Sequence, residues 1–343
     1  MAQGYFRMST FSLLGRLSAC VLLFCALTAC TSLPHAPKNT VAKSAEITTP
    51  AKQSASAPEL LAPGQTFTGG WLTNKLDANG FPLPGPTQGF SALVSPTALA
   101  VRGTDLYVAD SGTRKLYRLD TVTQTMSVMP GIVALPWTQM QVGSDHSLYV
   151  LDPMRLTILH FSRGLQPLRS LGDPAATISL SGFVLDVPLG QIVASDRISQ
   201  RLVMFSPIGG PAMLLDSGIK GEFRALGALA TDGHTIYAVD GACFCISALD
   251  EAGRGKERIG QGVLAQPRAL AADRYGHIFV ADAGDRTLKV FLQGKMIANY
   301  PVQTLRLIEI SALAVDEDVL YVADSGGSKI LSFRIQTSVG GQR

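Results

Sequence analysis

The sequence feature that most constrains the fold is a repeat of about 42 residues. Six short apolar segments end in an aspartate, and aliphatic residues stand four positions before and six positions after each one. The aspartates are Asp110, Asp152, Asp196, Asp240, Asp282 and Asp324. Their spacings are 42, 44, 44, 42 and 42 residues. A period of this length with strand-like content predicts a β-propeller with about four strands per blade. The expected fold is therefore all-β, with six blades.

One copy of the repeat contains the strands of one blade. Residues 98–101, 106–109, 116–119 and 124–129 form four strand-like segments, and the polar, Gly-containing residues 102–105 predict the first turn. The second strand is a continuous apolar run, as expected for a strand covered on both faces. Each blade is therefore expected to cover its neighbours.

The last copy lacks a fourth strand, because a Gly-rich tail follows its third strand. An unfilled position would leave an exposed edge and an open ring. We expect a strand from residues 59–71 to complete the last blade and join the two ends of the chain. The predicted organisation is a closing strand and lead-in segment at 64–89, the propeller at 90–337 and a tail at 338–343.

The repeat resembles the NHL repeat, in which Tyr-Val-Ala-Asp-Ser-Gly is followed by a basic and an aliphatic residue. Asp110 with Arg114 and Asp282 with Arg286 match this pattern best, and blades two to four depart from it after the aspartate. The resemblance covers residues 90–335 and implies a six-bladed propeller. NHL propellers include enzymes, scaffolds and nucleic-acid binders, so it implies no single function.

The first residues predict an export signal. Arg7 and Arg16 precede an uncharged apolar run at 17–29, which is typical of a signal peptide and too short to span a membrane. The run ends in Leu-Thr-Ala-Cys and resembles the lipobox of bacterial lipoproteins. The resemblance implies cleavage of residues 1–29 and acylation of Cys30. An ordinary signal peptide cut at the same place and an uncleaved anchor are the alternatives.

The residues after Cys30 predict where the protein resides. Several acyl chains on Cys30 would hold the chain stably in a bilayer, and Thr31 is not the aspartate that retains many lipoproteins at the inner membrane. We therefore expect an outer-membrane lipoprotein that faces the periplasm, with surface exposure as a further possibility. Residues 30–63 are rich in Ala, Pro, Ser, Thr and Lys and predict a flexible tether.

The repeat aspartates are expected to be structural. A turn aspartate accepts backbone N–H groups of its own loop and pairs with a nearby Arg or Lys. One aspartate per blade also places the six aspartates in separate blades, whereas a metal site needs several ligands at one point.

The innermost strands carry no His, Asp or Glu at their centres. His146, His234 and His277 stand at equivalent turns and are expected to point outward. We therefore predict no metal site, no cofactor and no catalytic residue.

Cys243 and Cys245 are the remaining unusual pair. Residues i and i+2 of a strand share a face, so the two side chains can meet. Three interpretations stay open: a local disulfide, two reduced thiols in the core, or a redox, metal-binding or partner-linking role.

The function expected from the sequence is that of a binding or scaffold subunit of an envelope assembly, with catalysis less favoured. Other envelope proteins are the expected partners, together with the membrane through the lipid anchor. The net charge of +3, from 29 basic and 26 acidic side chains, disfavours nucleic acid, whose binders usually carry a clustered basic face. The alternatives are a lactonase- or lyase-like enzyme acting at the channel mouth and a carbohydrate or peptidoglycan binder.

Overall fold

The computed structural model describes residues 60–73, 87–152, 154–172, 179–187, 191–206, 208–215, 223–250 and 252–336. The predicted signal peptide, Cys30, nearly all of the predicted tether and the predicted tail lie outside these ranges. Within them there are strands and turns but no helix. The described residues therefore contain no helix that could cross a membrane.

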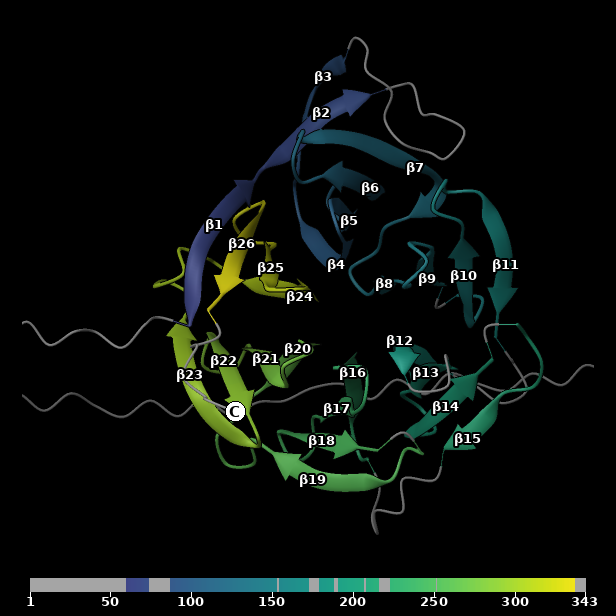
Figure 1. Ribbon diagram of the computed structural model, residues 1–343, viewed down its shortest axis with the longest axis vertical. Coiled ribbons are helices and arrows are strands. Elements are labelled where there is room, and N and C mark those ends of the chain that lie inside the picture. Colours follow the sequence, from purple (N-terminus) through teal and green to yellow (C-terminus); the bar gives the residue numbers. More distant parts are fainter. Residues whose placement is uncertain are drawn as a thin grey trace, which may run out of the picture. The chain divides into compact units, whose positions relative to one another are not determined.

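The described chain forms six sheets around a central axis, which confirms the predicted six-bladed propeller (Figure 1). The innermost strands are β4 (Pro96–Arg102), β8 (Met140–Val142), β12 (Leu180–Val187), β16 (Leu226–Thr231), β20 (Pro267–Ala272) and β24 (Ile310–Asp316). The second strands are β5 (Asp105–Asp110), β9 (Leu148–Asp152), β13 (Gln191–Asp196), β17 (Ile236–Asp240), β21 (His277–Asp282) and β25 (Val319–Asp324). Each repeat aspartate therefore ends the second strand of its blade.

The outer half of each blade follows the same order. The third strands are β6 (Lys115–Asp120), β10 (Thr157–Phe161), β14 (Arg201–Phe205), β18 (Cys245–Leu249), β22 (Thr287–Leu292) and β26 (Lys329–Ile335). The fourth strands of blades one to five are β7 (Thr125–Val133), β11 (Pro167–Leu171), β15 (Met213–Leu215), β19 (Gly255–Ile259) and β23 (Lys295–Pro301). Among these four strands of each blade, neighbouring strands pair antiparallel, from the innermost strand at the axis to the fourth strand at the rim.

The ring is closed by β1 (Leu61–Phe67), which confirms the predicted N-terminal closing strand. It pairs antiparallel with β26, from Leu61 opposite Ile335 to Phe67 opposite Ile330. The strand begins three residues before the predicted boundary at 64, so the end of the predicted tether belongs to the sheet.

The same segment continues into the first blade, which the repeat did not predict. β2 (Gly69–Thr73) pairs in parallel with β7, and β3 (Thr87–Ala92) pairs with β2, giving a sheet of six strands. A Cβ on Gly70 would come within 2.7 Å of the Met126 Cβ, so the close approach of β2 to β7 requires glycine. Residues 61–73 therefore connect the last blade to the first.

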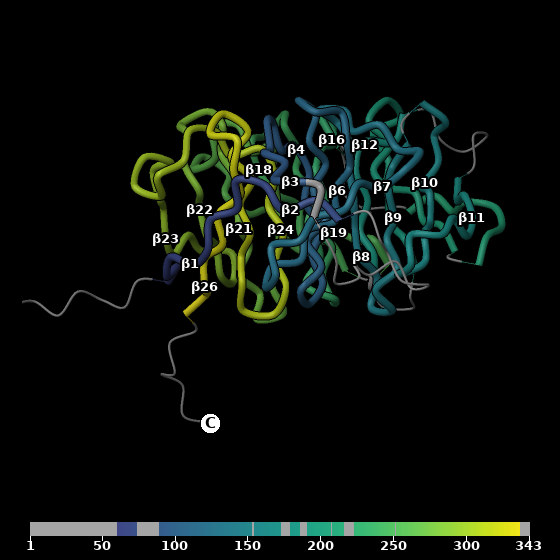
Figure 2. The backbone as a smooth tube through the Cα atoms, turned by 90° about the horizontal axis from the view of Figure 1, so that it is seen from above, coloured from purple at the N-terminus to yellow at the C-terminus, as the bar shows by residue number. Residues whose placement is uncertain are grey.

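The disc has two different faces. We call the face with the loops between second and third strands and the connections between blades the loop face. The face with the hairpins between first and second strands and between third and fourth strands is the hairpin face. Gln336 donates its N–H to the Leu60 carbonyl at 2.8 Å, so both ends of the described chain lie together, at the hairpin edge of the last blade (Figure 2).

The repeat aspartates organise the loop face. Asp110 accepts the N–H groups of Val94 and Ser95, at 2.7 and 2.9 Å, and that of Gly112 at 2.9 Å. Asp282 and Asp324 similarly join the connection before their blade to their own loop. The residue four positions after each aspartate has a positive φ between 49° and 59°, and these residues are Arg114, Leu156, Gln200, Phe244, Arg286 and Ser328. Six loops of one shape therefore recur around the face.

Asp152 and Asp324 lie beside nearby cations as expected, Arg155 at 3.5 Å and Lys329 at 3.8 Å, but the cation at Asp282 differs from the one the repeat suggested. Arg286 donates to the Ile308 carbonyl rather than to Asp282. The partner of Asp282 is the buried Lys289, with its Nζ 2.7 Å from Oδ2, and Lys289 also contacts Asp285. Burial alone would raise the pKa of Asp282, but the Lys289 and backbone N–H bonds outweigh it and lower that pKa. Burial alone would lower the pKa of Lys289, but its two carboxylates outweigh it and raise that pKa.

Replacing Lys289 with Met is expected to destabilise the propeller by about 2 kcal/mol near neutral pH, because charged hydrogen bonds to two carboxylates are lost. Because the Asp282 pKa is lowered, this group stabilises the folded protein at pH values above its unfolded-state pKa near 3.9. That stabilisation is lost as the pH falls through the folded-state pKa. Because the Lys289 pKa is raised, this group stabilises the folded protein at pH values below its unfolded-state pKa near 10.4. That stabilisation is lost as the pH rises through the folded-state pKa. Urea unfolding from pH 3 to pH 11 should show the largest difference between the proteins at intermediate pH. A difference independent of pH would contradict the ionic origin.

Candidate functional site

A central channel runs between the six innermost strands and encloses a cavity of about 830 Å³. Its walls are aliphatic where the sequence predicted the centres of these strands, with Leu99, Val184, Leu229, Leu270 and Leu313 among the lining residues. The other lining residues belong to the ends of these strands and to the first hairpins. The cavity therefore has an apolar wall and a polar mouth on the hairpin face.

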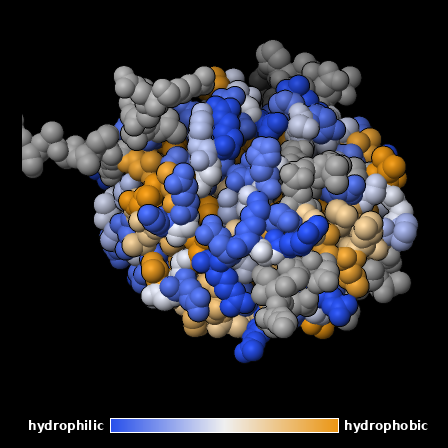
Figure 3. All heavy atoms as spheres, turned by 60° about the horizontal axis from the view of Figure 1, so that its bottom comes forward, coloured by the Kyte–Doolittle hydropathy of each residue, from blue (hydrophilic) through white to orange (hydrophobic). Residues whose placement is uncertain are grey.

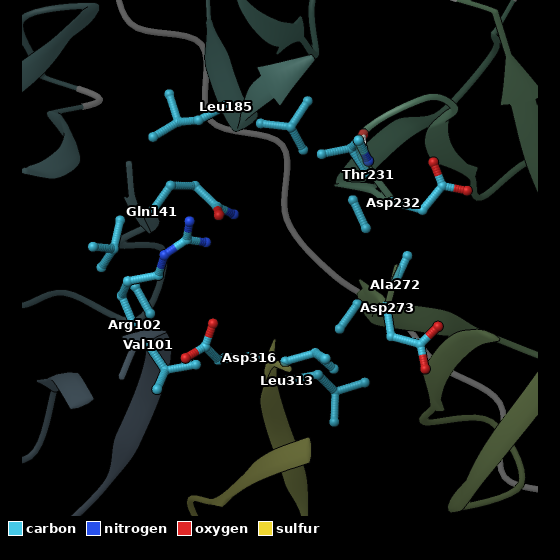
Figure 4. Close-up of a pocket in the computed structure, with 18 of the residues that line it drawn as sticks. Val101, Arg102, Gln141, Leu185, Thr231, Asp232, Ala272, Asp273, Leu313 and Asp316 are labelled. Carbon is cyan, nitrogen blue, oxygen red and sulfur yellow. Dashed lines mark hydrogen bonds between the residues drawn. The ribbon is translucent and has the colours of Figure 1, made fainter. Parts of the chain in front are cut away.

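Few polar side chains at this mouth point inward. Figure 4 shows Arg102, Gln141 and Asp316 on one side of the channel, while Asp232 and Asp273 point away from its centre. Asp316 accepts the Gly103 N–H at 2.6 Å. Other polar residues, among them Ser144, His146, Thr231, Arg274 and Glu317, also line the cavity. Among the described residues, no three His, Cys, Asp or Glu side chains converge to hold a metal ion.

The histidines at the first hairpins do not all point outward, which corrects the sequence prediction. His234 is exposed, but His146 lines the channel and His277 is only 6% exposed. The His277 Nδ1 lies 2.7 Å from Oδ2 of Asp273, which also accepts the His277 N–H. The carboxylate that shapes this turn thus draws the ring inward, an effect invisible in the spacing of the histidines.

His160 is buried elsewhere, against the ring of Tyr149. The two ring centroids lie 4.1 Å apart in a stacked arrangement. Neither ring nitrogen has a hydrogen-bond partner, and burial lowers the pKa of the imidazole. This histidine therefore acts as a neutral packing group.

The loop face carries a set of exposed apolar side chains, which we call the apolar set. Each is 42–80% exposed, although most large apolar residues of the repeat are buried. The members are Val94, Trp137, Met154, Ile198, Phe244, Val263 and Ile308. They come from the loops and connections of all six blades, so apolar surface recurs around the face.

Exposed arginines lie among the same loops. We call them the arginine set, and its members are Arg114, Arg155, Arg197, Arg224, Arg268, Arg286 and Arg306. In the described loops and connections of this face, the exposed acidic residues are only Asp285 and Glu309. No basic cluster is visible in the sequence, because these arginines stand far apart in the chain and the fold brings them to one face.

The loop face is also hollowed between blades five and six. A cavity of about 330 Å³ is lined by Arg268, Arg286, Glu309 and Ile308, with neighbouring backbone. It combines charged and apolar groups from the two sets at one place. The cavity is therefore a recess with both charged and apolar walls.

The hairpin face differs in composition. Among its described hairpins, the exposed large apolar residues are Val122, Ile208 and Tyr275. Its exposed charges are of both signs, with Arg254 and Glu317 as examples. Hydrophobic side chains also gather in patches on the side of the molecule that Figure 3 presents, among hydrophilic ones. The pairing of apolar residues with an excess of arginine is a feature of the loop face.

Cys243 and Cys245 form a disulfide in the structure. Cys243 belongs to the loop after Asp240, and β18 begins only at Cys245. The positive φ of Phe244 brings the two Cα atoms to 5.2 Å, closer than the roughly 6.6 Å of two residues in an extended strand. The local bridge thus arises from the bend of the repeat loop rather than from a shared strand face.

Comparison with solved structures shows the fold. The chain is similar to a Bacteroides thetaiotaomicron protein of unknown function, with a TM-score of 0.58, 14% identity and coverage of 72% of this chain and 71% of that one. It is similar to a gluconolactonase from Xanthomonas campestris, with a TM-score of 0.56, 15% identity and coverage of 71% and 87%. It is also similar to virginiamycin B lyase from Staphylococcus aureus, with a TM-score of 0.53, 10% identity and coverage of 71% and 96%.

The sequence comparisons give no family. No protein-family model matches the chain, and no curated protein matches it. The structural neighbours include lactonase- and lyase-like enzymes, but identities of 10–15% establish the six-bladed arrangement and no activity.

Proposed function

We propose that this chain is a binding propeller of the bacterial envelope, anchored by acyl chains on Cys30 and facing the periplasm from the outer membrane. Its partner is a protein with an acidic surface that docks on the loop face. The observation that carries the proposal is the coincidence of the apolar set with the arginine set on one face. Exposed apolar surface marks interaction sites, and arginine is enriched at protein interfaces.

The point where the predicted tether joins the propeller supports a protein partner rather than a lipid surface. The described chain begins at Leu60, on the hairpin edge of the last blade, beside Gln336. A chain anchored at Cys30 would approach the propeller from that side. The loop face would then be free to meet a partner away from the anchoring membrane.

The proposal is tested by photo-crosslinking in intact cells. A photoreactive phenylalanine analogue replaces Met154 or Ile198 on the loop face, and Val122 or Ile208 on the hairpin face as matched exposed controls. We expect one protein partner of fixed mass from both loop-face positions and none from the controls. Equal crosslinking from both faces, or lipid as the crosslinked product, would overturn the proposal.

Charge reversal gives a quantitative prediction. Arg155→Glu combined with Arg197→Glu should reduce the crosslinked product at least about tenfold, because each lost cation at a complementary interface costs on the order of 1 kcal/mol. The matched control is Arg254→Glu with Lys295→Glu on the hairpin side, which should leave the product unchanged. Both double variants should keep the melting temperature within about 2 °C, since exposed charges contribute little to stability. A loss that is equal in the two double variants contradicts docking on the loop face.

A further inference from the structure

The Cys243–Cys245 bridge is not needed to shape its loop. All six blades have four residues between the repeat aspartate and the third strand, with a left-handed residue in the fourth place. Five of these loops adopt that shape without a disulfide among the described residues. In blade four, Asp240 also accepts the N–H groups of Ala225 and Ala242, at 3.1 and 3.0 Å. The loop shape is thus set by hydrogen bonds, and the bridge is an addition to it.

The two cysteine residues differ in burial. Cys243 is half-buried in the loop, whereas Cys245 is fully buried in the first position of β18. Phe244 stands between them and is 46% exposed on the loop face. Cys243 is thus the cysteine nearer to solvent, while the core shields Cys245. Arg224, which precedes the Ala225 that bonds Asp240, is exposed in the connection before this blade, and positive charge close to a reacting sulfur favours the thiolate.

We propose that this bridge is an exchange site for thiols, at which Cys243 forms a mixed disulfide with a thiol-bearing molecule. The thiolate of the incoming molecule attacks the Cys243 sulfur and forms a new S–S bond as the Cys243–Cys245 bond breaks. The electron pair of the broken bond leaves on Cys245, which takes up the proton released by the incoming thiol. The step is a thiol–disulfide exchange with no net oxidation, and the thiol is the only co-reactant. A second thiol releases the adduct and leaves Cys243 and Cys245 reduced.

The test treats the folded full-length protein with millimolar reduced glutathione without denaturant. Free thiols are blocked, and glutathione adducts are then located by peptide fragment masses, which separate Cys243 from Cys245. We expect an adduct on Cys243 and a free thiol on Cys245, followed by complete reduction. Structural disulfides resist the glutathione pool, so a bridge that stays oxidised under these conditions overturns the proposal.

Single-cysteine variants separate the roles of the two sulfurs. In Cys245→Ser, Cys243 should react with oxidised glutathione at least about 100-fold faster than Cys245 does in Cys243→Ser, because exposure controls thiol reactivity. Equal rates would contradict the assigned roles. The double variant with both cysteines changed to serine should keep the melting temperature within a few degrees, since five loops form without a bridge. A large loss of stability would show a structural disulfide instead.

Discussion

Deletion of residues 59–75 is expected to lower the melting temperature by about 15 °C or more, or to prevent folding. The deletion removes β1 and β2 and exposes the edge of β26. Leu61 and Phe67 are 1% and 2% exposed, and loss of such side chains costs about 2–5 kcal/mol each. For a domain of this size each kcal/mol is worth roughly 2 °C or more. The loss approaches the 5–15 kcal/mol that stabilises a typical domain.

Point variants on β1 distinguish closure from a general effect of truncation. Leu61→Ala with Phe67→Ala should reproduce most of the loss, while Thr66→Ala, which changes an exposed residue of the same strand, should leave the melting curve unchanged. Calorimetry measures both. If the deletion melts like the intact chain, the ring does not depend on its N-terminal strand.

The blade architecture could be predicted because its signals are local and recur six times. Leu106 and Leu116, which flank Asp110 in the repeat, are both fully buried. Each equivalent position of the repeat therefore corresponds to one packing position in every blade. The closing strand could be inferred by counting, since one blade lacked its fourth strand. These inferences need no knowledge of contacts between distant residues.

The addition of β2 and β3 to the first blade could not be predicted in that way. This pairing occurs in one blade only, so no residue pattern shared by the six copies of the repeat predicts it. It depends on the glycine at position 70, beside which the Met126 and Leu119 side chains leave no room for a Cβ. Such a close approach is set by the tertiary fold.

The candidate binding face was missed for a related reason. Arg114, Arg197 and Arg306 are far apart in the chain and look unremarkable one at a time, and the net charge of +3 averages the two faces of the disc. The repeat alone does not show which loop residues lie on the same face of the propeller.

Breaking the buried ion pair between Asp105 and Arg118 is expected to be the most damaging single substitution in the first blade. Arg118 is 2% exposed, and its Nε and Nη2 donate to Asp105 Oδ1 at 3.0 and 2.8 Å. Asp105→Ala leaves the guanidinium buried beside Tyr107, whose pKa burial raises to about 12. Removing one partner of a buried pair costs about 3–5 kcal/mol, which corresponds to a loss of roughly 6–10 °C or more.

The companion variants test whether the cost comes from the broken ion pair. Asp105→Ala combined with Arg118→Met should recover much of the stability lost in Asp105→Ala alone, because an apolar replacement of both partners leaves no buried charge. Asp105→Asn keeps an acceptor and should lie between the wild-type chain and Asp105→Ala. Urea unfolding of the wild-type chain, Asp105→Ala, Arg118→Met and the combined variant gives the coupling energy as a double-mutant cycle. Strictly additive losses would mean that the two side chains stabilise the blade independently, through packing rather than through their ion pair.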